Sequence, residues 1–128
     1  MSLRSPMGRV LGLGSAKDGT SHWWSTRVTS LALVPLCIWF VVSLYGIDVS
    51  DHGAVVHFMR QPINTILLLV LVPIACYHSM LGTQEIVEDY QHDKGRKVLA
   101  LILLQFLHTL VAVSGLYAVL KVAFGSSL

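Results

Sequence analysis

The chain has 128 residues, of which 54% are hydrophobic and 12% charged, and its mean hydropathy is +0.67. An average soluble domain carries about 25% charged residues, so this chain has too few charges to cover a water-facing surface. Its length leaves room for one compact unit, and its hydrophobicity argues against disorder. The formal charge of +2 comes from Lys and Arg scattered between apolar blocks, which argues against nucleic-acid binding.

Three apolar segments are long enough to cross a bilayer. A helix needs about 20 apolar residues to cross the hydrocarbon core, and residues 28–47, 63–86 and 98–124 qualify. We therefore expect an all-α membrane protein with one membrane-anchor domain over residues 1–128, in which residues 1–27 precede the first span. No small-residue cleavage site follows the first apolar run, so a cleaved signal peptide is a poor fit.

The first two spans and their connection contain further local signals. Pro35 and Pro73 lie inside spans, where neighbouring helices can satisfy the freed carbonyls, and we expect kinks there. Between the two spans, residues 48–62 predict a short interfacial helix that begins after an N-cap at Ser50 or Asp51. This helix is too short to cross the membrane.

The basic residues indicate the orientation in the membrane. Three spans place the N-terminal segment and the loop between the second and third spans on one side, and these two segments hold seven basic residues: Arg4, Arg9, Lys17, Arg27, Lys94, Arg96 and Lys97. The other side has only Arg60 and Lys121. Because cytoplasmic loops retain Lys and Arg, we expect a cytoplasmic N-terminus and a C-terminus in the opposite compartment.

A stripe of polar residues runs along one face of the second span. Its members recur near the helical period and are Asn64, His78, Gly82, Glu85 and Asp89. Tyr90 follows, about 18 Å along the helix from His78. Ionisable groups inside a membrane helix are costly and are therefore functional candidates.

Specific chemistry fits two positions of the stripe. A neutral imidazole at His78 suits an axial ligand of haem iron, and Gly82 one turn away leaves room for a flat macrocycle or another helix. A hydrogen bond from His78 to a neighbouring helix is the alternative. The phenol of Tyr90 could stabilise the negative oxygen of a quinone under reduction, or it could belong to the interfacial aromatic belt.

The residues of this stripe also match a known motif. Residues 78–90 read H-x3-G-x3-I-x2-D-Y and resemble the signature of the small, hydrophobic, haem-binding membrane anchor of succinate dehydrogenase. The resemblance extends to chain length, the three spans, their orientation and the sequence HWWSTR at residues 22–27. It therefore covers nearly the whole chain.

The resemblance implies roles for individual residues. His78 would be one axial ligand of a b-type haem, whose second histidine comes from a partner anchor. Tyr90 would hydrogen-bond ubiquinone, and Asp89 would support that site. Arg27 matches a family arginine near the haem propionates and the quinone pocket, although a basic residue there also suits positive-inside anchoring.

The resemblance also implies partners. The three spans would join a heteromeric helical bundle with a second membrane anchor (a cytochrome b subunit), docked to an iron–sulfur subunit and a flavoprotein. FAD and the iron–sulfur clusters would reside in those partners, since this chain has no dinucleotide fingerprint and no cysteine cluster. The chain would then contribute no catalytic residue to succinate oxidation. The N-terminus lacks an Arg/Ser-rich presequence, which favours a bacterial inner membrane.

Several residues stay outside this interpretation. His108, in the third span, could form an intrachain haem site with His78, but we favour a packing role for it. His22 is at most a supporting residue of the site. Cys37 and Cys76 are predicted to be buried packing residues. The remaining histidines are predicted to be solvated: His52, His57 and His92.

Three other functions remain open. A small proton or ion transporter subunit would use the polar stripe as a path through the membrane. An assembly factor would bind neither haem nor quinone. The anchor of a quinol:fumarate reductase shares the bundle architecture, and one anchor sequence does not reveal the direction of electron flow. The spacing from histidine to Asp-Tyr favours the succinate-oxidising type.

Overall fold

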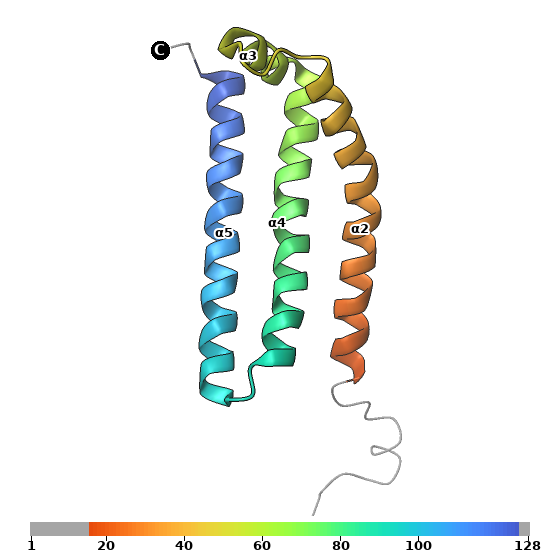
Figure 1. Ribbon diagram of the computed structural model, residues 1–128, viewed down its shortest axis with the longest axis vertical. Coiled ribbons are helices and arrows are strands. Elements are labelled where there is room, and N and C mark those ends of the chain that lie inside the picture. Colours follow the sequence, from red (N-terminus) through yellow and green to blue (C-terminus); the bar gives the residue numbers. More distant parts are fainter. Residues whose placement is uncertain (1–15, 126–128) are drawn as a thin grey trace, which may run out of the picture.

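The computed structural model describes residues 16–125, so Arg4 and Arg9 of the basic N-terminal segment lie outside the described residues. Within this range it contains helices and no strand, which confirms the all-α prediction (Figure 1). The helices are α2 (Ala16–Tyr45), α3 (His52–Arg60), α4 (Pro62–Tyr90) and α5 (Lys94–Phe124). Of these, α2, α4 and α5 are long and apolar enough to cross a membrane.

The long helices extend beyond the apolar segments of the sequence. The helix α2 begins at Ala16, so residues 16–27, expected to precede the span, are already helical. Apolarity marks where a chain crosses hydrocarbon, whereas backbone hydrogen bonds continue until a cap or a breaker ends the helix. Both α2 and α4 continue through their internal prolines, Pro35 and Pro73. The kinks at these prolines stay a prediction.

The short helix α3 begins as predicted. Asp51 is its N-cap and accepts a hydrogen bond from the Gly53 N–H at 2.8 Å, which satisfies a donor that the first helical turn leaves unpaired. Ser50, the other candidate, instead donates its hydroxyl to Asp48 at 2.6 Å. This hydrogen bond, together with one from the Ser50 N–H, lowers the pKa of Asp48.

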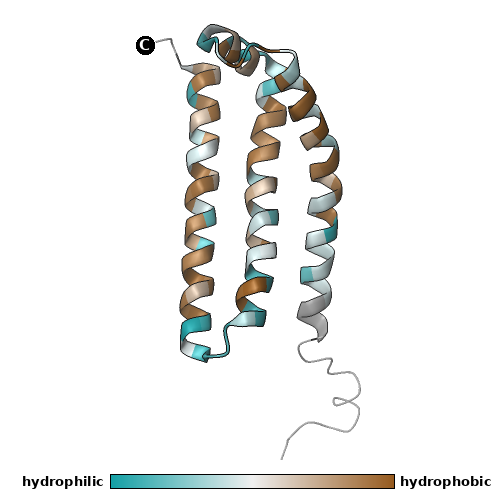
Figure 2. Ribbon diagram, viewed as in Figure 1, coloured by the Kyte–Doolittle hydropathy of each residue, from teal (hydrophilic) through white to brown (hydrophobic). Residues whose placement is uncertain are grey.

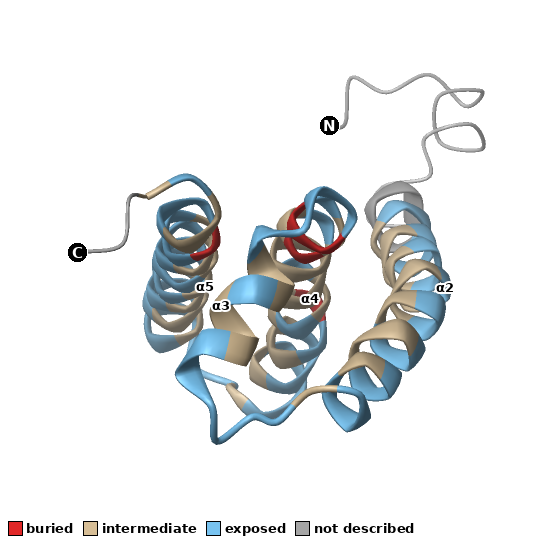
Figure 3. Cartoon of the chain, turned by 90° about the horizontal axis from the view of Figure 1, so that it is seen from above, coloured by how far each residue is buried: buried red, intermediate tan, exposed pale blue. Residues whose placement is uncertain are grey.

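The helix α4 is the centre of the bundle. It packs against both α2 and α5, whereas no close contact joins α2 to α5 within residues 16–125. Figure 3 shows α4 between the other two long helices. Where α4 and α5 meet, a Cβ added to Gly115 would stand 2.8 Å from Cγ1 of Val72. The absent side chain therefore permits this close approach.

The α3 end of the bundle is held by hydrogen bonds between elements. Arg60, the last residue of α3, donates to the carbonyls of Val122 at 3.1 Å and Gly125 at 2.8 Å, which caps the C-terminal end of α5. The Thr65 hydroxyl in α4 donates to the Met59 carbonyl at 2.6 Å. The packing of α3 is thus fixed against both neighbouring helices.

Most apolar side chains lie on the outside of the chain. In the most apolar 18-residue stretches of α2 and α5 no residue is buried, and in that of α4 only 17% are. Brown, hydrophobic residues cover much of the three long helices, and polar residues gather at the end of the bundle that carries the α4–α5 loop (Figure 2). Surfaces of this kind require lipid or protein partners. The prediction of two buried cysteines is wrong for Cys37, which is exposed on this outer surface, whereas Cys76 is half-buried.

The close contact at Gly115 is testable by substitution. We expect Gly115→Leu to lower the free energy of unfolding by about 1–3 kcal/mol relative to Gly82→Leu, because the new side chain meets Val72. Gly82 is a matched control, since a Cβ there has no neighbour within 4 Å. Denaturation of the full chain in detergent, followed by helical circular dichroism, measures the difference. Equal stabilities would contradict the proposed role of Gly115.

Candidate functional site

The candidate site lies between α2 and α4, with His78 near its centre. His78 is half-buried, and its Nδ1 lies 2.9 Å from the hydroxyl oxygen of Thr29 in α2. The same hydroxyl oxygen lies 2.8 Å from the Ser25 carbonyl and 3.1 Å from the Thr26 carbonyl. The histidine therefore contacts the neighbouring helix through a side chain that is itself bonded to that helix's backbone.

A polar face of α2 lies toward α4. Its half-buried members recur at helical spacing and are His22, Ser25, Thr26, Thr29 and Ser30. Thr26 and Ser30 donate to carbonyls one turn earlier, at 3.0 Å and 2.7 Å. Because their hydroxyl protons are bonded within α2, these residues can lie in an apolar bundle without water.

A second histidine contact joins the two helices nearer the α4–α5 loop. Nδ1 of His22 lies 3.4 Å from a carboxylate oxygen of Glu85, whose side chain is 56% exposed. Nε2 of His22 is buried and has no hydrogen-bond partner in the described part of the chain. An unpaired buried nitrogen is costly, so this atom is available to a group from outside the described residues.

The remaining motif residues lie on an open part of α4. Apart from its own helix, an added Cβ at Gly82 would meet no atom of the described residues within 4 Å, so the surface there is open to another molecule. Asp89 is exposed, and so is Tyr90, the last residue of α4, at 80%. The Tyr90 carbonyl accepts a hydrogen bond from Nδ1 of His92 at 3.1 Å. The stripe thus runs from a half-buried imidazole to an exposed phenol at the loop.

Arg27 lies apart from this stripe. Its guanidinium lies 5.4 Å from the ring centre of Trp23, and both side chains are exposed. This distance is within the range of a cation–π contact. Among the described residues, no hydrogen bond or ion pair joins Arg27 to His78 or Tyr90. Its position on the exposed face of α2 makes it available to a partner chain.

Asn64, the far member of the stripe, has a structural role in the chain. It is 6% exposed, and its side-chain amide donates to the Phe58 carbonyl at 2.9 Å and lies 3.3 Å from the Gln61 side-chain oxygen. The amide therefore closes the junction between α3 and α4. It does not line an open polar path with the other members of the stripe.

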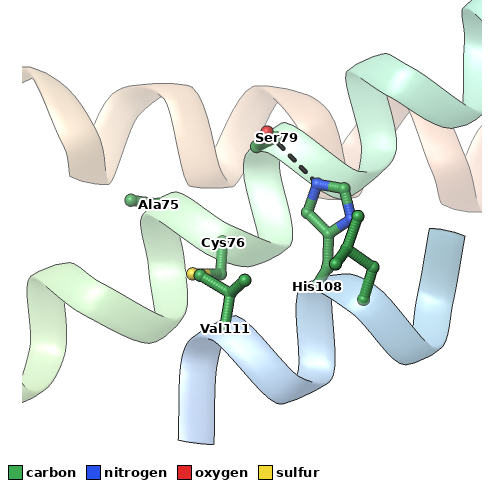
Figure 4. A pocket seen from close by; sticks show the side chains of 6 residues that line it. Ala75, Cys76, Ser79, His108 and Val111 are labelled. Carbon is green, nitrogen blue, oxygen red and sulfur yellow. Dashed lines mark hydrogen bonds between the residues drawn. The ribbon is translucent and has the colours of Figure 1, made fainter. Parts of the chain in front are cut away.

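His108 belongs to a different contact, between α4 and α5. Its Nδ1 donates to the Leu104 carbonyl at 2.9 Å, and its Nε2 accepts from the Ser79 hydroxyl at 3.3 Å (Figure 4). Beside it lies a cavity of about 350 Å³ lined partly by Cys76 and Val111. His78 is bonded to α2 instead, so no hydrogen bond brings the two histidines together in the described chain.

The other histidines are exposed, and their solvation stays a prediction. His52, His57 and His92 are exposed. Across the described residues, no three His, Cys, Asp or Glu side chains form a group that could hold a metal ion.

Sequence reasoning missed Thr29 as a partner of His78. A signal was present, because His22, Ser25, Thr26 and Thr29 are spaced as one face of a helix that enters an apolar span. The pattern shows that α2 has a polar side. It does not show which residue of another helix that side meets.

Comparisons with known proteins place the chain in a family. A profile described as the succinate dehydrogenase/fumarate reductase transmembrane subunit matches residues 1–112. A succinate dehydrogenase hydrophobic membrane anchor subunit from Rickettsia bellii is 36% identical over 68% of this chain and 70% of its own length. One from Paracoccus denitrificans is 27% identical over 95% of this chain and 94% of its own. No solved structure gives a significant match.

The role of Asn64 can be tested separately from the rest of the stripe. We expect Asn64→Leu to lower the free energy of unfolding by about 1–3 kcal/mol, because the Phe58 carbonyl loses its shorter hydrogen bond and keeps only the one from the Gln61 N–H at 3.3 Å. Gln105→Leu, which removes an exposed amide from α5, is the matched control and should change stability little. Denaturation in detergent measures both variants. A stable Asn64→Leu variant would refute the structural role.

Proposed function

Because the chain belongs to the succinate dehydrogenase/fumarate reductase transmembrane subunit family, we propose that it is the hydrophobic membrane anchor of a succinate:ubiquinone oxidoreductase. Its three long apolar helices supply the multi-pass anchor. Relatives named succinate dehydrogenase anchors match along most of the chain, which favours the succinate-oxidising complex over a quinol:fumarate reductase. In this role the chain holds no residue that acts on succinate.

The observation that carries the proposal is the placement of His78. It is half-buried within a membrane helix, and its Nε2 has no hydrogen-bond partner in the described part of the chain. Gly82, one turn away, leaves the adjacent surface open. We propose that Nε2 is one axial ligand of a haem b, with the second ligand supplied by a partner anchor.

The residues around His78 fit such a group. A neutral imidazole with one nitrogen free is a suitable iron ligand. The open surface at Gly82 and the unpaired, buried Nε2 of His22 leave both space and a polar contact for a molecule from outside the chain. When bound, the haem would accept and release single electrons. The chain's own residues would hold it and shield it from water.

The quinone site is proposed at the exposed end of α4. The phenol of Tyr90 would donate a hydrogen bond to a ubiquinone carbonyl, which becomes more negative as it is reduced. Asp89 precedes it and is exposed, so it can exchange protons with water at the membrane surface. Arg27 would act from α2, where it lies between the residues that contact Glu85 and His78. Quinone reduction consumes two protons, and a site at the surface can receive them.

The proposed assembly contains three further subunits. The exposed apolar faces of α2 and α5 leave room for a second anchor and for lipid. An iron–sulfur subunit and a flavoprotein would dock at the α4–α5 loop, where the first residues of α2 also lie (Figure 1). The distribution of basic residues supports a cytoplasmic location for this end. We propose the bacterial inner membrane as the site of the complex.

The haem assignment predicts the effect of removing the imidazole. We expect His78→Ala to abolish the reducible b-type absorbance of the complex purified in mild detergent, because the iron loses an axial ligand. His57→Ala removes an exposed imidazole from α3 and should leave the spectrum unchanged. An unchanged spectrum in His78→Ala, in a complex that contains all its subunits, would refute the assignment.

The quinone assignment predicts a selective loss of activity. We expect Tyr90→Phe to lower kcat/KM for ubiquinone on the order of 100-fold, the effect of removing one donor to a developing negative oxygen. Succinate oxidation with a soluble artificial acceptor and the haem spectrum should stay unchanged. Tyr117→Phe, at an exposed tyrosine of α5, is the matched control. Normal ubiquinone kinetics in Tyr90→Phe would remove Tyr90 from the site.

A further inference from the structure

The hydroxyl of Thr29 has more neighbours than it has protons. It lies 2.8 Å from the Ser25 carbonyl, 3.1 Å from the Thr26 carbonyl and 2.9 Å from Nδ1 of His78. A hydroxyl carries one proton and can accept through its lone pairs. The two carbonyls can only accept, whereas an imidazole nitrogen can donate or accept. The proton on Nδ1 therefore decides whether all these contacts can be hydrogen bonds at once.

One arrangement satisfies the short contacts. The Thr29 hydroxyl donates to the Ser25 carbonyl, and its oxygen accepts the proton carried by Nδ1 of His78. If Nδ1 were unprotonated, the single hydroxyl proton would be shared between Nδ1 and the carbonyls, and one short contact would bring two acceptors together. We propose that Thr29 is a positioning residue that holds His78 in the tautomer protonated on Nδ1 and unprotonated on Nε2.

This inference rests on the proposed role of His78 as a haem ligand and extends it to α2. Histidines that bind metals usually donate their other ring N–H to a second group, which fixes the ring and makes the ligating nitrogen more basic. Here that group is a hydroxyl already polarised by its own hydrogen bond to Ser25, and such chains strengthen each member. Thr29 is half-buried, so water does not readily replace it.

The consequence for a bound haem is a change in its midpoint potential. A more basic imidazole stabilises ferric iron more than ferrous iron, so the hydrogen bond to Thr29 keeps the potential low. Loss of this bond should raise the potential. If ferric binding weakens tenfold more than ferrous binding, the shift is about 59 mV for a one-electron couple.

The test uses four variants of the intact complex, one of which is His78→Ala. Thr29→Val keeps the shape and removes the hydroxyl, and Thr29→Ser keeps the hydroxyl. Thr109→Val removes an exposed hydroxyl of α5 that donates to a carbonyl one turn earlier, at 2.8 Å, and serves as the control. Redox titration of the haem and haem content per complex are measured for each variant.

We expect Thr29→Val to raise the midpoint potential and to lower haem affinity by on the order of tenfold. Thr29→Ser and Thr109→Val should match the unmodified complex. An unchanged potential in Thr29→Val, while His78→Ala loses its haem spectrum, would overturn the role of Thr29 and leave the haem proposal standing. A normal haem spectrum in His78→Ala would instead overturn the haem proposal itself.

A measurement without haem keeps the inference testable if Thr29→Val does not assemble. The full chain, labelled with nitrogen-15 at histidine and held in detergent, gives imidazole nitrogen chemical shifts that distinguish the two tautomers. The His78 signals are assigned by their loss in His78→Ala. We expect protonated Nδ1 in the unmodified chain and a mixture of tautomers in Thr29→Val. The same mixture in both chains would overturn the inference.

Discussion

A polar group inside a hydrocarbon layer must find its hydrogen-bond partner within protein, since lipid offers none. This constraint governs the contact between α2 and α4. Thr26, Thr29 and Ser30 bind backbone carbonyls of their own helix, so α2 can carry a polar face into the membrane. That face meets His78 and Glu85 of α4. The orientation of these two helices is thus tied to the chemistry of the site.

The same constraint explains how much the sequence could predict. The three spans, an N-cap at Ser50 or Asp51 and the stripe toward Tyr90 follow from signals within a single helix, and the structure contains the spans, the cap at Asp51 and the stripe. Contacts between helices depend on how far each is rotated about its axis, which composition does not determine. For this reason the Thr29 contact was missed. Asn64 was assigned to the stripe because it lies on the same face of the second span as the other members. In the structure its side-chain amide donates to the Phe58 carbonyl of α3.

The exposure of the apolar residues also has a physical explanation. Burial was expected for Cys37 because it lies in an apolar run, but Cys37 is exposed. The apolar side chains of a membrane helix can pack against lipid as well as against protein. Few side chains are buried among the described residues, so packing within that part of the chain contributes little to a unique arrangement of the helices. Hydrogen bonds at the helix ends, such as those from Arg60 to the last turn of α5, carry much of that specificity.

The central position of α4 has a consequence for biogenesis. A ribosome synthesises α2 first, yet α2 has no contact with α5 in the described structure and meets α4 as its only long neighbour. During synthesis, the polar face of α2 therefore has no contact with another long helix of the described structure until α4 is inserted. The hydroxyls of Thr26 and Ser30 already donate to backbone carbonyls of α2, which lowers the free-energy cost of exposing this face to lipid before α4 arrives. The order in which the helices leave the translocon thus matches the order in which their contacts can form.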